Sequence, residues 1–179
     1  MSRHCETEYF IARHCGVAMA GLKAASLVQY PKGGEGCVSH LRKSLGKKGI
    51  CFRALETKKA KLMLVYREEV LLRHLTFGEN RDFLAAAGYP ESGTVAGYIA
   101  VLEERLTRED FPHEIGIFLG YPLEDVLGFV ERPHSCEYCG VWKVYKNAEE
   151  KKKLFAQYKT CCERIIDMVR TGKQLAEIF

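Results

Sequence analysis

The sequence lacks long apolar runs and any sign of several domains. No segment approaches the roughly 18 consecutive apolar residues that a membrane-spanning helix needs, and the first ten residues, MSRHCETEYF, carry charges where a secretory leader has an apolar stretch. Internal repeats, low-complexity tracts and linkers are also missing. We therefore expect one cytoplasmic domain without a membrane partner, because 179 residues with 47% hydrophobic content can bury about 70% of the unfolded surface in a single core.

The charges and cysteines narrow the function classes further. The net charge is only +4, and the 27 Lys and Arg residues are interleaved with 23 Asp and Glu, which gives little support to a nucleic acid partner. Eight cysteines are present. In a reducing cytoplasm they are thiols, so they serve as core residues, metal ligands or reactive groups and not as a disulfide framework.

Hydrophobic spacing predicts an α+β fold, a small and mostly antiparallel sheet of about four strands surrounded by helices, in one domain covering 1–179. One helix is expected to start near Cys15 and run toward Tyr30, and a long charged helix over 148–170. The expected strands are 50–56, 61–66, 114–119 and 141–145, the first two as a hairpin.

Several segments resemble a known family. They read HCGVAMAGLKAASL, LMLVYR, FPHEIGIFLGYPLEDVLGFV and CEYCGVWKVY, followed later by LFAQYKTC. Over nearly the whole chain they resemble the bacterial domain-of-unknown-function family 3793, small proteins mostly of anaerobes. The resemblance implies a single-domain cytosolic protein and supplies no function. The family's marked positions fall here on Cys15, Lys23, Tyr66, Arg67, His113, Glu114, Trp142, Lys143 and Tyr145.

Cys15 and His113 are candidates for thiol catalysis. A cysteine at a helix N-terminus has a lowered pKa, and a histidine at a strand mouth can act as its base. The HEIGIFLG segment resembles the His strand of papain-like hydrolases, cell-wall peptidases among them. Glu114 is a third candidate, although neighbours on a strand point to opposite faces and do not easily orient each other. The alternative is a buried cysteine with a structural His–Glu pair.

The HSCEYCG segment, residues 134–140, is a candidate metal knuckle. Cys136 and Cys139 form a C-x-x-C followed by Gly, and zinc or iron would need two further ligands. His134, Cys161 and Cys162 are the candidates for these. The alternatives to a metal site at these residues are a redox-active dithiol and a turn with two reduced thiols.

A third set, Lys23, Tyr66, Arg67, Lys143 and Tyr145, is basic and aromatic. On one concave surface these side chains would bind a small anionic ligand. The alternative is a solvated face with extended Lys and Arg stems.

Three functional hypotheses follow. The first is a cytosolic thiol-dependent protein that acts on or carries a small anionic ligand, with papain-like Cys–His chemistry as one version. The second is a non-catalytic zinc- or iron-binding protein, in which Cys15, His14 or His113 supply ligands. The third is an adaptor whose charged C-terminal helix docks a partner protein. Whether the protein is an enzyme is left open, and the sequence names no substrate.

Overall fold

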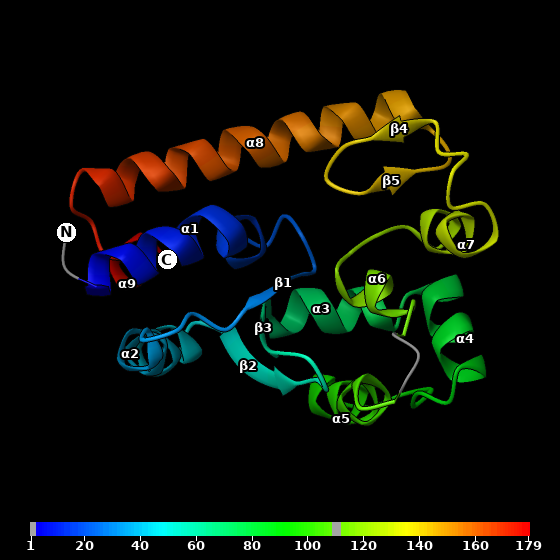
Figure 1. Cartoon of the computed structure of the whole chain (residues 1–179), viewed down its shortest axis with the longest axis horizontal. Helices are drawn as coiled ribbons and strands as arrows, with labels where there is room; N and C mark the ends of the chain where they lie inside the picture. Colours follow the sequence, from blue (N-terminus) through cyan, green and yellow to red (C-terminus); the bar gives the residue numbers. More distant parts are fainter. Residues whose placement is uncertain (1–2, 109–111) are drawn as a thin grey trace.

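A three-stranded antiparallel sheet lies at the centre of the molecule (Figure 1). The computed structural model describes residues 3–108 and 112–179. The strand order is β1-β3-β2, with both ladders antiparallel. Along β3, Met63 and Val65 belong to one buried cluster while Leu64 and Tyr66 belong to another, because successive strand side chains point to opposite faces. The sheet is therefore buried on both sides. Its strands are β1 (Ala25–Gln29), β2 (Ile50–Glu56) and β3 (Lys61–Arg67).

One face of the sheet is covered by helices from the two ends of the chain. Ile11 and Met19 of α1 pack with Leu41 of α2 against this face, and Ile165 and Val169 of α8 close the cluster from outside. Figure 1 shows the long helix α8 running beside α1, with α9 near the C-terminal end of α8. The elements are α1 (Arg3–Met19), α2 (Glu35–Gly46), α8 (Ala148–Arg170) and α9 (Leu175–Ile178).

The opposite face is covered by helices from the middle of the chain. Leu71, Tyr98 and Phe118, from three of these helices, are buried together with Leu64 and Tyr66 of β3. The helices are α3 (Glu68–Leu75), α4 (Gly78–Ala86), α5 (Val95–Leu106) and the single turn α6 (Ile115–Phe118).

A small hairpin and the first half of α8 form a third, separate cluster. In the hairpin, β4 (Tyr138–Cys139) pairs antiparallel with β5 (Lys143–Val144). Trp142 and Val144 pack on Phe155 and Tyr158 in the first half of α8. Helix α7 (Leu123–Glu131) lies between this hairpin and α6 (Figure 1).

The α+β class is confirmed, and so are the β2–β3 hairpin and the helix over 148–170. The expected strand over 114–119 is wrong. Residues 115–118 form the helical turn α6, and all four are buried, so the alternation of Ile and Gly does not separate an inner from an outer face. Gly120 ends the turn at a φ of +78°, where the N–H of Tyr121 reaches back to the carbonyl of Gly116 at 2.9 Å.

The expected helix from Cys15 toward Tyr30 is also wrong. Helix α1 starts at Arg3 and ends at Met19, and residues 25–29 form strand β1. Gly21, with a φ of +77°, turns the chain away from the helix, and the N–H of Leu22 donates to the carbonyl of Val17 at 3.1 Å. The last expected strand, 141–145, shortens to β5 and belongs to the separate hairpin, not to the central sheet. In the described ranges no helix is long and apolar enough to cross a membrane.

Candidate ligand-binding site

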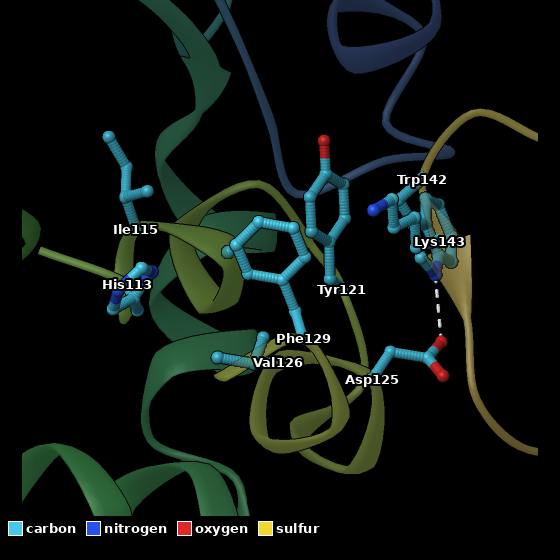
Figure 2. Close-up of a pocket in the computed structure, with 9 residues that line it drawn as sticks. His113, Ile115, Tyr121, Asp125, Val126, Phe129, Trp142 and Lys143 are labelled. Atoms are coloured by element: carbon cyan, nitrogen blue, oxygen red, sulfur yellow. Dashed lines mark hydrogen bonds between the residues drawn. The ribbon is translucent and has the colours of Figure 1, made fainter. Parts of the chain in front are cut away.

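A cavity of about 500 Å³ lies between α6, α7 and the β4–β5 hairpin. Figure 2 shows the side chains that line it, with Phe129 near the middle of the view. The lining is largely apolar and aromatic, which is typical of sites for small organic molecules. It consists of His113, Ile115 and Gly116 around α6, Tyr121, Asp125, Val126 and Phe129 around α7, and Trp142 and Lys143 of the hairpin.

Stacked aromatic rings form one wall of the cavity. The rings of Tyr121 and Trp142 lie with centroids 4.7 Å apart and planes inclined by 26°. On α8, Phe155 meets Trp142 edge-on, at 4.5 Å and 84°. Edge-to-face and offset-stacked arrangements are the favourable ones for aromatic pairs. The contact with Phe155 of α8 therefore stabilises the position of this wall.

A buried carboxylate fixes the position of Trp142. Asp125 is only 2% exposed. Its Oδ2 accepts the indole N–H of Trp142 at 2.7 Å, the bond drawn in Figure 2, and its Oδ1 accepts the backbone N–H of Tyr145 at 2.7 Å. Each oxygen of this buried carboxylate accepts one of these hydrogen bonds, so Asp125 connects α7 to the hairpin.

Two glycines allow α7 to approach its neighbours. A Cβ on Gly116 would lie 2.7 Å from Cγ2 of Val126, and one on Gly128 would lie 2.4 Å from Cγ of Tyr145. Both distances are shorter than carbon atoms tolerate. The shape of the cavity therefore depends on the missing side chains at these two positions.

Two polar side chains of the lining, those of His113 and Lys143, lie near the ring of Phe129. The ring of His113 lies 5.8 Å from the ring of Phe129, and Nζ of Lys143 lies 5.4 Å from the same ring. Nζ of Lys143 also donates to the carbonyl of Pro133 at 2.7 Å. His113 is exposed, Lys143 is half-buried and Phe129 is 43% exposed, so this side of the cavity faces solvent.

Cys15 lies elsewhere, in the core between α1, α2, the sheet and α8. It sits in the last turns of α1 and not at a helix start, so the expected dipole effect is absent. Burial raises the pKa of its thiol to about 12, against a smaller lowering by Lys23. Among the described residues, Cys15 and His113 share neither a cavity nor a hydrogen bond.

Glu114 is a structural residue in this arrangement. It is 6% exposed, forms an ion pair with Arg105 of α5 and accepts the hydroxyl of Tyr89 at 3.2 Å. Arg105 also donates to the carbonyl of Ala87 at 3.1 Å. Glu114 thus connects the start of α6 to α5, while its neighbour His113 lines the cavity.

Of the expected ligand-binding set, the structure brings Lys143 into the cavity lining. Lys23 lies behind it, with Nζ 5.6 Å from the ring of Tyr121. Burial lowers the pKa of Lys23 to about 8, and the charge of Cys15 opposes this shift.

The other three members of that set, Arg67, Tyr66 and Tyr145, make contacts within the fold and do not line the cavity. Arg67 donates to the carbonyls of Met19 at 2.6 Å and of Lys48 at 3.3 Å, and so caps α1. Tyr66 is buried in the core, which raises the pKa of its hydroxyl. Tyr145 is 4% exposed beside Gly128. These residues do not form one concave surface with Lys143.

The expected metal ligands are not gathered either. In residues 3–108 and 112–179, no group of three or more His, Cys, Asp and Glu side chains is arranged to hold a metal ion. Cys136 and Cys139 lie on the hairpin, with His134 exposed before it, whereas Cys161 lies on α8 beside the core that contains Cys15.

Sequence reasoning missed Tyr121, Asp125, Val126 and Phe129 as site residues. Their pattern is that of an ordinary amphipathic helix start, and aromatic residues in such a pattern usually belong to a core. Only the packing of α7 against the hairpin brings them together with Trp142 and Lys143.

A family model described as "Protein of unknown function (DUF3793)" matches residues 11–179. The chain belongs to this family. The match covers every residue of the cavity lining in the DUF3793 chain. Neither a search of curated proteins nor one of solved structures found a match.

Proposed function

We propose that the protein binds a small, largely apolar molecule in the cavity between α6, α7 and the hairpin. The observation that carries the proposal is the aromatic lining, in which Trp142 is held in place by Asp125, Tyr121 and Phe155. A volume of about 500 Å³ is within the range of sites for cofactors and metabolites. Because the wall is held by contacts outside the cavity, binding requires little reorganisation of the protein, which favours affinity.

The proposal is one of binding and carrying, without a chemical step. A thiol step at Cys15 would need a thiolate in a position where burial raises the pKa to about 12. No described contact favours the metal-binding or adaptor hypotheses over this one. A cytoplasmic location is part of the proposal, because the cysteines with described side chains are all free thiols.

The single tryptophan gives a direct test. Trp142 is the one Trp in the sequence and lies in the cavity wall. The neutral dye N-phenyl-1-naphthylamine accepts energy from tryptophan, so its binding should quench Trp142 emission saturably, with one dye per protein. Phe129→Ala should weaken this binding about tenfold, because it removes an aromatic contact of the ligand.

A matched variant controls for surface binding of the dye. Phe77 is 69% exposed and lies outside the cavity lining, so Phe77→Ala should leave the titration unchanged. Quenching that does not saturate, or that both variants change equally, would overturn the proposal.

A further inference from the structure

Lys143 gives the cavity lining a positive charge, and no carboxylate among residues 3–108 and 112–179 lies within ion-pair distance of it. Lys143 is half-buried in the lining, and in the described ranges none of the ion pairs includes it. The acidic side chain of the lining, Asp125, already accepts hydrogen bonds from Trp142 and Tyr145. A half-buried ammonium without such a partner is a site for an anion, since an apolar surrounding strengthens the attraction.

The ammonium of Lys143 is also positioned. Its Nζ donates one hydrogen bond, to the carbonyl of Pro133 at 2.7 Å, and lies 5.4 Å from the ring of Phe129. An ammonium has three N–H donors, so two are available to an oxygen of a ligand. A ring in contact with Phe129 would carry a substituent within reach of these donors.

We propose that the ligand is an aromatic acid, a planar ring system with one anionic group, whose ring packs between Phe129 and the Tyr121–Trp142 stack. The anionic oxygens accept hydrogen bonds from the ammonium of Lys143. This inference rests on the proposed function, and it adds the charge and shape of the ligand. His113, on the other side of Phe129 at 5.8 Å, offers ring nitrogens to a second polar substituent.

Two pairs of probes differ in the anionic group. N-Phenyl-1-naphthylamine and 8-anilinonaphthalene-1-sulfonate share a skeleton, and only the second carries a sulfonate. 1-Naphthoate and 1-naphthamide differ in the same way through a carboxylate. With Trp142 emission as the signal, each anion should bind about tenfold more tightly than its neutral counterpart, as expected for a charge-assisted hydrogen bond to a half-buried ammonium.

Variants of Lys143 test the cause of this preference. Lys143→Met should abolish the advantage of both anions while neutral dye still binds, which also shows that the variant folds. Lys143→Arg should retain most of it. Lys152 of α8 offers a matched control. Its Nζ lies 5.2 Å from the ring of Tyr138 in the hairpin, and neither residue belongs to the cavity lining. Lys152→Met should leave all four affinities unchanged.

The outcomes separate the two proposals. If neither dye binds saturably, the proposed function fails and this inference fails with it. If the neutral dye binds but the anions have no advantage, or if the advantage persists in Lys143→Met, the cavity is a binding site and the assignment of an aromatic acid is wrong.

Discussion

The carboxylate of Asp125 joins α7 to the hairpin through Trp142, whose indole N–H it accepts at 2.7 Å while being almost inaccessible to water. Its second oxygen accepts the backbone N–H of Tyr145 at the same distance. The two bonds connect the aromatic wall of the cavity to the helix that supplies Phe129. Stability and ligand binding are therefore coupled at Asp125.

Asp125→Asn should destabilise the protein by about 2–4 kcal/mol, because an amide has one acceptor oxygen and turns its NH₂ toward one of the two donors. Urea unfolding followed by Trp142 emission measures the change. Asp167→Asn is the control, since that carboxylate is 71% exposed and its substitution should change stability by less than about 0.5 kcal/mol. Equal changes in the free energy of unfolding for the two substitutions would show that the buried hydrogen bonds of Asp125 do not stabilise the fold.

Gly128→Ala should both destabilise the fold and weaken dye binding. The added Cβ would lie 2.4 Å from Cγ of Tyr145, so α7 must move away from the hairpin, at about 1–3 kcal/mol for an overpacked contact. Gly36 in α2 has no atom within 4 Å of its added Cβ, and Gly36→Ala should leave stability equal or slightly higher. Thermal unfolding and the dye titration check both variants. Unchanged dye affinity in Gly128→Ala would contradict the role given to this contact.

The sequence indicated the elements whose pattern is long or unambiguous. The inward-facing residues of α8, such as Phe155, Tyr158 and Ile165, recur at helical spacing over many turns, and this helix lies where it was expected. The same reasoning did not predict α6. In a single turn whose four residues are all buried, the residue pattern does not distinguish an inner from an outer face. Strand β1 was missed because Ala24 and Ala25 continue an alanine-rich helical pattern, and Gly21 was the one local sign that the helix had ended.

The candidate site was predictable only in part. The family resemblance drew attention to Trp142, Lys143 and His113, which line the cavity, and also to Cys15, which is buried in a different core. Residue identity alone does not separate these cases. The separation depends on which helix end a residue occupies and on how α7 packs, and both are set by tertiary contacts.

Cys15 should resist alkylation in the folded protein. Burial raises the pKa of its thiol from 9.0 to about 12, which lowers the thiolate fraction about a thousandfold at neutral pH, and the side chain is inaccessible. With iodoacetamide at pH 7.5, peptide mass mapping should find the exposed Cys139 modified first and Cys15 modified only as fast as the protein unfolds. Rapid native-state labelling of Cys15 would return the thiol hypothesis to consideration.

Lys23 should make stability depend on alkaline pH. Burial lowers its pKa from 10.5 to about 8 in the folded protein, with Cys15 opposing the shift. Between these two values the unfolded chain holds a proton that the folded protein has released, so the Lys23 contribution to the free energy of unfolding rises with pH across this window. Cys15 acts in the opposite direction above pH 9, since its folded pKa is the higher one.

Comparison with Lys23→Met isolates the lysine, because the variant keeps Cys15. Below pH 8 wild type carries the unfavourable burial of a charged ammonium, which Met lacks, so the variant should be the more stable by up to about 3 kcal/mol. That difference should shrink steadily between pH 8 and 10.5 as folded Lys23 loses its proton. Urea unfolding at half-unit pH steps measures it, with Lys58→Met, an exposed position, expected to track wild type. A difference that stays constant across the window would mean that Lys23 remains hydrated and fully charged beside Tyr121.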